Sequence, residues 1–246
     1  ALAAIKASGG ARYGIFLPLN EWVVPAVLGL QAGSPLLAEQ DSRGDFSGAA
    51  FQQGFDFFLQ LFREELAPLA GSQEIANIYQ EFARGTFAMI VTGPWNIGEF
   101  RRRLPAELQA AWATAPLPGP GGPASGVSLA GGSSLVVFRN SPHQAAAWQF
   151  VEYLARPAVQ RRFYLLTGDL PARRATWVSP EIAADSSLAA FRIQLERVVS
   201  TPKIPEWEQI AYRLQLRAEA AVRGSLTADE ALAALDADVD RILEKR

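Results

Sequence analysis

Residues 82–95 read Phe82-Ala-Arg-Gly-Thr-Phe-Ala-Met-Ile-Val-Thr-Gly-Pro-Trp95. Arg84-Gly85 ends a helix that we predict over 73–84, because glycine commonly follows the last turn of a helix. The apolar run over 86–92 is typical of a strand that is buried on both faces of a parallel sheet. The strand stops at Gly93-Pro94-Trp95. This turn therefore presents its side chains at the carboxyl edge of the sheet, where open α/β folds bind ligands.

Segments of strand and helix length alternate along the rest of the chain. Short apolar strands are predicted at 13–17 and 134–138. The phenylalanines of 51–66 recur at helical spacing and predict one helix with a buried stripe. Further helices are predicted at about 157–167, 188–199, 206–223 and 228–243, the last opened by a capping box of Thr227 and Glu230. Strands that alternate with helices predict an α/β fold with mainly parallel pairing.

Two groups of residues are assigned to packing and solvation rather than to a site. Trp148 lies in the middle of an apolar helical stretch with Phe150, so we expect it in the core. The carboxylates Asp236, Asp238 and Asp240 fall on a polar helix face, and we expect them to be solvated charges.

The composition excludes several classes of function. The chain has 246 residues, of which 49% are hydrophobic, and this argues for a substantial core and against disorder. The formal net charge is −2, and Arg101-Arg102-Arg103 is the one dense basic run. A nucleic-acid binder usually has a basic excess over one face, so this charge balance argues against a nucleic-acid partner. There is no cysteine and a single histidine, His143, so disulfides, zinc–thiolate clusters and histidine-based triads are excluded. We therefore expect a protein without catalytic residues, metal or cofactor.

Polar and aromatic residues gather in two predicted loops. Trp95 offers a flat apolar face of the kind that stacks on a sugar ring, and Asn96 can cap the next helix and donate to a hydroxyl group. Trp22 follows the strand at 13–17 and has Asn20 and Glu21 beside it. An aromatic face with an amide and a carboxylate suits a pyranose, which has apolar faces and a polar rim.

Each of these aromatic residues also has an interpretation from packing alone. Trp95 can be a core residue after a structural turn, and Trp22 can belong to a partly exposed loop without a ligand. Trp207, in Ile204-Pro-Glu-Trp207, either lines a cleft or seals the start of a helix, and we favour the second role.

Taken in order, the motifs resemble maltose-binding proteins and other family 1 extracellular solute-binding proteins. No one motif is decisive, but their succession spans nearly the whole chain. The likeness begins with 82–95, continues through Gly131-Gly132, 145–154, 157–160 and 168–173, and ends in 204–207 and 224–231.

The resemblance implies a periplasmic-binding-protein-like fold of type II, in which two α/β lobes close on a ligand. By position, Trp95 matches the family's stacking tryptophan, Trp22 matches an aromatic residue of the earlier ligand loop with Asn20 two residues before it, and Tyr212 matches an aromatic residue of the late helix. Ala211 stands where maltose binders can carry a second stacking tryptophan, and Gln215 where they can carry arginine. These departures put maltose specificity in doubt, though not sugar binding.

The resemblance also predicts how the chain divides. Residues 1–126 and 182–246 are assigned to a nearly complete C-terminal lobe, and 127–181 to part of the N-terminal lobe. The family's first segment, which builds most of the N-terminal lobe, is expected to be missing. We therefore expect the isolated chain to bind sugar poorly, and a second copy or a preceding segment to cover the apolar strand at Leu135 and Val137.

The function implied is that of an extracytoplasmic receptor, periplasmic or at the cell surface, which delivers a mono- or oligosaccharide to the permease subunits of an ABC importer. Contact with the membrane is expected only through the permease or a lost lipid anchor. A receptor for a non-sugar solute is the alternative. A glycerol phosphate would bind a cluster of arginines, and Arg173-Arg174 is a candidate for it. A polyamine would bind between acidic and aromatic side chains. A carbohydrate-active enzyme would need two facing carboxyl groups, and Glu21 is the one candidate.

Overall fold

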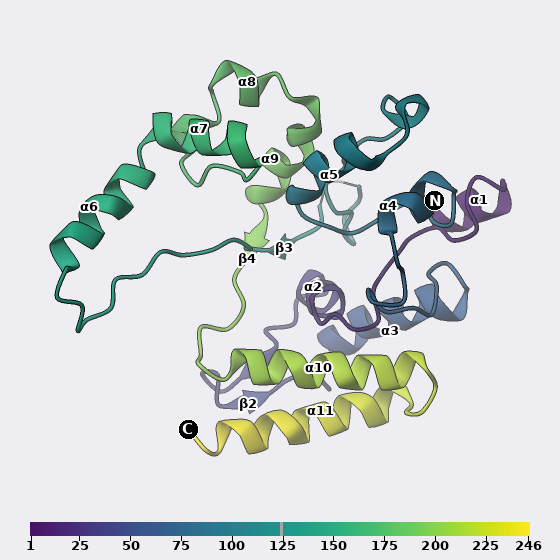
Figure 1. The fold of residues 1–246 in the computed structure, drawn as a ribbon. Helices are drawn as coiled ribbons and strands as arrows, with labels where there is room; N and C mark the ends of the chain where they lie inside the picture. Colours follow the sequence, from purple (N-terminus) through teal and green to yellow (C-terminus); the bar gives the residue numbers. More distant parts are fainter. Residues whose placement is uncertain (124) are drawn as a thin grey trace. The chain divides into compact units, whose positions relative to one another are not determined.

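The computed structural model describes residues 1–123 and 125–246, which form two compact units (Figure 1). Unit 1 comprises Ala1–Val91, Leu117–Ala130 and Arg197–Arg246. Unit 2 comprises Thr92–Pro116 and Gly131–Glu196.

This division differs from the predicted boundaries in where it places 92–116, 127–130 and 182–196. Residues 127–130 belong to unit 1. The other two segments belong to unit 2, because Ile97 and the partly buried Trp112 pack in one cluster with Trp177, Ile182 and Leu188. Packing between segments that are far apart in the sequence produces no periodic pattern, so the sequence could not predict it. The assignment of lobes stays a prediction.

Unit 1 combines a helical core with short paired strands. Its elements are α1 (Leu2–Ala7), α2 (Val23–Gln31), β1 (Leu37–Ala38), β2 (Arg43–Gly44), α3 (Ala49–Arg63), α4 (Ile78–Ala83), β3 (Ser128–Leu129), β4 (Val198–Val199), α10 (Trp207–Val222) and α11 (Ala228–Leu243). β1 and β2 pair antiparallel with Leu37 opposite Gly44, and β3 and β4 pair parallel with Ser128 opposite Val198.

The two apolar segments predicted as strands, 13–17 and 86–92, lie side by side as parallel chains. Single bridges join Tyr13 to Phe87 and Phe16 to Ile90, and Phe16 N–H donates to the Met89 carbonyl at 2.8 Å. The parallel pairing is therefore confirmed. The prediction of burial on both faces is wrong for 86–92, because Phe87 is buried whereas Met89 is exposed.

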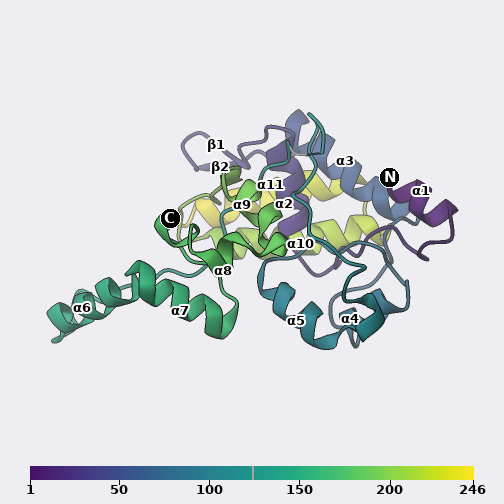
Figure 2. The same ribbon diagram turned by 90° about the horizontal axis from the view of Figure 1, so that it is seen from above.

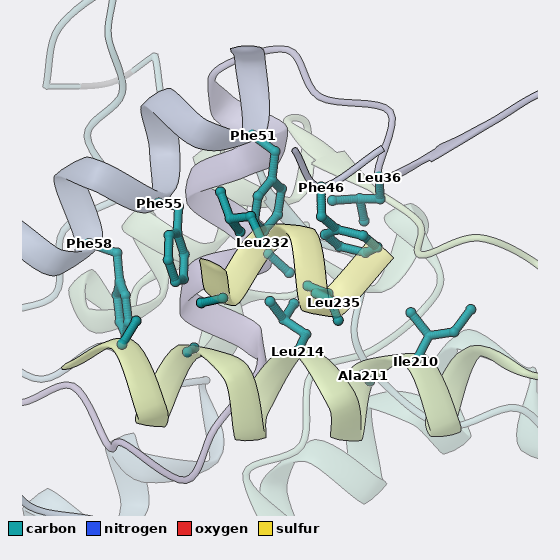
Figure 3. Close-up of a cluster of buried hydrophobic side chains, with 14 of the residues drawn as sticks. Leu36, Phe46, Phe51, Phe55, Phe58, Ile210, Ala211, Leu214, Leu232 and Leu235 are labelled. Carbon is teal, nitrogen blue, oxygen red and sulfur yellow. The ribbon is translucent and has the colours of Figure 1, made fainter. Parts of the chain in front are cut away.

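The aromatic stripe of α3 forms the centre of the unit 1 core, as predicted. Its buried phenylalanines contact one another along the helix: the rings of Phe51 and Phe55 stack with centroids at 6.2 Å, and those of Phe58 and Phe62 meet edge to face at 5.1 Å. Figure 3 shows this stripe facing Leu214 of α10 and Leu232 and Leu235 of α11. On α3's side toward α2, a Cβ at Gly54 would collide with the backbone of α2, so glycine there permits the close approach of the two helices.

α10 and α11 pack side by side as a helical pair at the C-terminus (Figures 1 and 2). The predicted capping box is confirmed, since Glu230 N–H donates to Thr227 Oγ1 and Thr227 N–H donates to Glu230 Oε2. α10 ends at Val222, and Gly224 follows in a left-handed conformation.

The prediction of solvated charges on α11 is wrong. Asp238 is buried and accepts from Arg217 Nη2 at 2.6 Å, and Arg241 also donates to it. Asp236 accepts backbone N–H bonds from Phe46 and Ser47, both at 2.8 Å. Asp240 accepts from Gly44 N–H in the same way at 2.8 Å. The polar face is thus covered by the strand–loop segment after β1, whose backbone donors need these acceptors.

Unit 2 is built from short helices. They are α5 (Trp95–Arg103), η1 (Ala106–Leu108), α6 (Gln144–Leu154), α7 (Pro157–Thr167), η2 (Arg174–Thr176), α8 (Pro180–Ala183), η3 (Ser186–Leu188) and α9 (Ala189–Leu195). α7 and α11 have the predicted bounds, whereas α4 and α9 are shorter than predicted. No strand is formed at 134–138 in the described chain, where Leu135, Val136 and Phe138 are exposed.

Trp148 is 56% exposed on α6, so its assignment to the core is wrong. Phe150 on the same helix is exposed as well. Among the described residues α6 packs against α7, and the apolar face that the sequence pattern assigned to a core is exposed.

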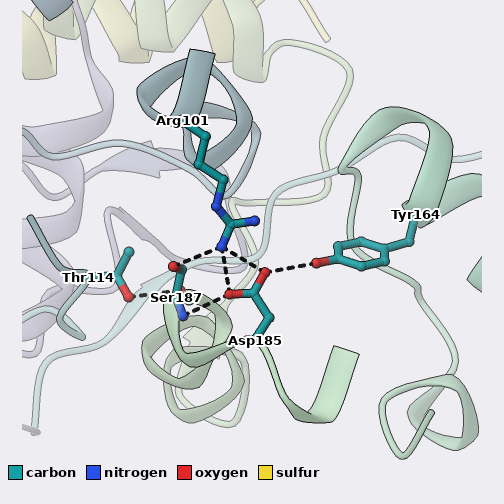
Figure 4. A network of polar contacts seen from close by, with 5 residues as sticks. All are labelled: Arg101, Thr114, Tyr164, Asp185 and Ser187. Atoms are coloured by element: carbon teal, nitrogen blue, oxygen red, sulfur yellow. Dashed lines mark hydrogen bonds and ion pairs between the residues drawn. The ribbon is translucent and has the colours of Figure 1, made fainter. Parts of the chain in front are cut away.

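A polar network joins the segments of unit 2 (Figure 4). Arg101 of α5 donates through Nη2 to both oxygens of Asp185, at 2.8 and 2.9 Å, and to Ser187 Oγ at 3.1 Å. Tyr164 of α7 donates to Asp185 Oδ2 at 3.2 Å, and Thr114 Oγ1 donates to the Ser187 carbonyl at 2.8 Å. Burial opposes the ionisation of Asp185, but hydrogen bonds from Arg101 and from Ser187 N–H outweigh it and lower its pKa.

The contacts of Asp236 predict a stability effect. Asp236→Ala leaves two backbone N–H donors without their acceptor, so the free energy of unfolding falls by about 1–3 kcal/mol. Urea unfolding followed by circular dichroism measures it. Asp56→Ala is the control, because Asp56 is exposed on α3 and its loss changes stability by less than about 0.5 kcal/mol. Equal effects of the two substitutions would contradict a stabilising role of the hydrogen bonds that Asp236 accepts.

The network predicts a pH dependence. The folded-state pKa of Asp185 is lowered, so its stabilisation is present above the ordinary pKa of about 4 and is lost as the pH falls through the lower folded value. Asp185→Asn therefore lowers the melting temperature at pH 7, and the difference from the unsubstituted chain closes below about pH 4. Thermal unfolding between pH 3 and pH 7 measures this. A difference that does not vary with pH would contradict it.

Candidate functional site

Three candidate residues of unit 1 lie on the loop that follows the paired segment at 13–17. Asn20 is fixed by its own side chain, because Oδ1 accepts from Ser72 N–H at 2.7 Å and from Ser72 Oγ at 3.0 Å. Its amide nitrogen has no hydrogen-bond partner in the described part of the chain. Asn20 therefore holds two loops together through its oxygen and retains a free donor.

Glu21 and Trp22 complete this loop. Glu21 is half-buried, and burial raises the pKa of its carboxyl group. Trp22 is the N-cap residue of α2 and is also half-buried. The structure therefore places the three predicted residues of the loop next to one another at the start of a helix.

Trp207, at the start of α10, contacts Trp22. Its ring meets that of Trp22 edge to face, with centroids 5.4 Å apart and planes at 81°. Trp207 is 6% exposed at the first position of α10, and its Nε1–H has no partner in the described chain. The contact supports the role that we favoured from sequence, the sealing of a helix start, and its role toward a ligand stays a prediction.

Ala211 and Tyr212 lie about one turn further along α10 and differ in exposure. Tyr212 is 54% exposed, whereas Ala211 is 1% exposed in the core. Tyr212 follows Trp207 by five residues, which places the two side chains about 140° apart around the helix. The position of Ala211 does not face solvent in this chain, so Tyr212 is the aromatic side chain that α10 presents there.

Glu206, which we did not single out from sequence, belongs beside these residues. It is the N-cap residue of α10 and directly precedes Trp207. Its Oε2 is buried without a hydrogen-bond partner in the described chain. A buried carboxylate oxygen usually accepts a hydrogen bond, so Glu206 Oε2 needs a donor. In the sequence, only its position between Pro205 and Trp207 at a predicted helix start pointed to it.

Among the candidate residues of unit 2, Trp95 is the first residue of α5. Its side chain is 64% exposed. Asn96 Nδ2 donates to Thr92 Oγ1, and Asn96 N–H donates to the Gly93 carbonyl at 3.2 Å. The turn is closed by these bonds, and the indole is presented on its surface. The interpretation of Trp95 as a core residue is wrong.

Arg173 is exposed just before η2 in unit 2, and its N–H donates to Gln160 Oε1 at 2.9 Å. The neighbouring Arg174 is paired with Glu196, with Nη2–Oε2 at 2.9 Å. Of the two arginines, Arg173 is thus the one whose charge is not neutralised by a neighbouring carboxylate in the described chain.

The described residues offer no other centre of chemistry. They contain no group of three or more histidine, cysteine, aspartate or glutamate side chains that can hold a metal ion. None of the described helices combines the length and hydropathy that a membrane crossing requires. A cavity of about 420 Å³ in unit 1 contains none of the predicted ligand residues; its lining includes Leu59, Arg63, Leu226 and Glu230.

Comparison with known proteins gives the family. A family model described as bacterial extracellular solute-binding protein matches residues 4–190. The maltotriose-binding protein of Pyrococcus abyssi is 26% identical over 200 residues, which cover 79% of this chain and 42% of that protein.

Solved structures give the fold. The sugar-binding protein MalE of Xanthomonas citri is 44% identical with a TM-score of 0.94, and the match covers 100% of this chain and 62% of that one. The GacH receptor of Streptomyces glaucescens, solved unliganded and with acarbose, is 24% identical with a TM-score of 0.83 and coverages of 99% and 62%. The chain thus spans less than two thirds of the length of these proteins. It belongs to the bacterial extracellular solute-binding proteins and has the type II fold of the periplasmic sugar-binding proteins among them.

Proposed function

We propose that this chain is the ligand-binding part of an extracytoplasmic receptor that delivers a sugar to an ABC importer. The single observation that carries the proposal is Trp95, an indole that is 64% exposed at the start of α5. Trp95 follows the paired segment at 86–92, at the carboxyl end where open α/β folds bind ligands, and its ring is open to solvent there. The 44% identity to the sugar-binding protein of Xanthomonas citri supports a carbohydrate as that ligand.

The physical basis is stacking combined with directed hydrogen bonds. The C–H face of a pyranose fits the flat indole of Trp95, and its hydroxyl groups need donors and acceptors. Unit 1 supplies the free amide nitrogen of Asn20, the carboxyl group of Glu21 and the phenol of Tyr212. Closure of the two lobes brings such groups around the ligand in this fold.

The receptor performs no chemistry on its ligand. Hydrolysis of a glycosidic bond requires two carboxyl groups facing each other across the sugar. Glu21 is one half-buried carboxyl group with a raised pKa, whereas Glu206 has its Oε2 buried in the protein. The three aspartates of α11 are engaged by backbone N–H groups or by arginine. The residues of the site therefore serve to hold a ligand, and the partner is the permease of the importer.

A cationic solute such as a polyamine is the second candidate. Two carboxyl groups, Glu21 and Glu206, directly precede Trp22 and Trp207 in the sequence, and carboxyl groups beside aromatic rings suit an amine. A glycerol phosphate is less well supported, because Glu196 neutralises Arg174 and leaves Arg173 alone.

A ligand panel separates these candidates. Isothermal titration calorimetry on the full-length product of the gene, with maltotriose, spermidine and glycerol 3-phosphate, is expected to give binding with the sugar. Heat of binding with spermidine alone would replace the proposal by the cationic candidate. Binding of glycerol 3-phosphate alone would assign the site to Arg173.

The role of Trp95 gives a direct prediction. Trp95→Ala weakens sugar binding by about 1–3 kcal/mol, which corresponds to roughly 5- to 150-fold in Kd, because the stacking surface is lost. Calorimetry of the variant measures the change. The melting temperature changes little, since the ring is exposed in the structure.

Trp148→Ala is the matched control for this variant. Trp148 has a similar exposure on α6, and its removal leaves the affinity for sugar unchanged. Unchanged affinity in Trp95→Ala, together with a large fall in melting temperature, would contradict the stacking role.

A further inference from the structure

Gly93 lies directly beneath the indole of Trp95. The side chain of a residue in the first turn of a helix points back toward the helix N-terminus, over the turn that precedes it. Trp95 is the first residue of α5, so its ring lies over Gly93-Pro94. A Cβ atom built on Gly93 would overlap Cε3, Cζ3 and Cη2 of the Trp95 ring.

Backbone conformation does not explain the glycine. Gly93 is absent from the residues with positive φ, so its φ is one that any L-residue adopts. A residue before proline favours extended conformations, which alanine also accepts. Space for the indole is therefore the physical reason for glycine at this position.

The helix that carries Trp95 is fixed from several directions. Ile97 N–H donates to the Pro94 carbonyl at 3.0 Å, and the Ile97 side chain is buried in the unit 2 cluster. Arg101, near the C-terminal end of α5, is bonded to Asp185 (Figure 4). A collision at residue 93 is thus relieved by movement of the exposed ring and not by movement of α5.

We infer that Gly93 is a positioning residue, which holds the Trp95 indole in one orientation by giving its six-membered ring a flat surface to rest on. The inference rests on the proposed function in one respect, since orientation matters because Trp95 stacks on a sugar. A platform that is already oriented binds with less loss of side-chain freedom. Any side chain at residue 93 turns the indole away from this orientation.

The structural half is tested without a ligand. The chain is labelled with 5-fluorotryptophan, and the ¹⁹F resonance of Trp95 is assigned as the one absent from Trp95→Phe. Gly93→Ala is expected to shift this resonance and to leave those of the other tryptophans in place. Gly98→Ala on α5 is the matched control, because a Cβ there meets only Arg102 Nη1 at 3.4 Å. An unshifted Trp95 resonance in Gly93→Ala would overturn the inference.

The functional half is tested by a double-mutant cycle on the full-length product of the gene, with maltotriose as the probe. Gly93→Ala is expected to weaken binding by about tenfold, and to have no further effect when Trp95 is already alanine. An equal effect in both backgrounds overturns the inference, because the substitution then acts without the indole. If Trp95→Ala leaves affinity unchanged, the stacking proposal fails, and the ¹⁹F shift still decides the role of Gly93.

Folding of the variants is part of the same test. Gly93→Ala is expected to keep a melting temperature close to that of the unsubstituted chain, because the displaced ring is exposed. If the single variant unfolds, recovery in Gly93→Ala/Trp95→Ala identifies the indole as the group that Gly93 accommodates. Loss of folding in both variants overturns the inference.

Discussion

The parallel pairing of the segments at 13–17 and 86–92 is the constraint on which the rest of the structure depends. Backbone hydrogen bonds such as Tyr13 N–H to the Thr86 carbonyl, at 2.9 Å, align the two chains in the same direction. The rings of Phe16 and Phe87 stack between them at 5.1 Å. Because the chains run in parallel, both leave this pairing at the same edge, and one leads to Trp22 and the other to Trp95.

Three aspartates of α11 hold segments of unit 1 together through hydrogen bonds. Asp236 and Asp240 accept backbone N–H groups from the segment before α3, and Asp238 is buried between Arg217 and Arg241. Carboxylates that accept backbone and arginine donors act as acceptors of fixed geometry and hold the segments together.

The two candidate loops are held in different ways. The loop at Asn20–Trp22 is fixed by a side-chain amide that bonds Ser72 and by the contact of Trp22 with Trp207. The turn at Gly93–Asn96 is fixed by hydrogen bonds from the backbone and side chain of Asn96, and the Trp95 indole is exposed. Trp22 is held by packing against Trp207, whereas we infer that the orientation of the Trp95 ring depends on Gly93 beneath it.

The sequence by itself determined the elements and the family. Phenylalanine spacing predicted α3, the Thr227–Glu230 pair predicted the start of α11, and the succession of motifs around Gly93-Pro94-Trp95 led to the solute-binding family. These are local signals, because helical periodicity and capping depend on residues within a few positions of each other. The candidate ligand residues Trp22 and Trp95 were found in the same way, by their places after apolar strands.

Only the tertiary structure decided which side chains are covered. The sequence pattern put Trp148 in the core and left the aspartates of α11 in solvent, and the structure reverses both. It also joined 92–116 to unit 2, buried Ala211 and left Glu206 Oε2 without a partner among the described residues. Burial depends on which distant segment packs against a face, and a periodic pattern states that a face is apolar without stating what covers it.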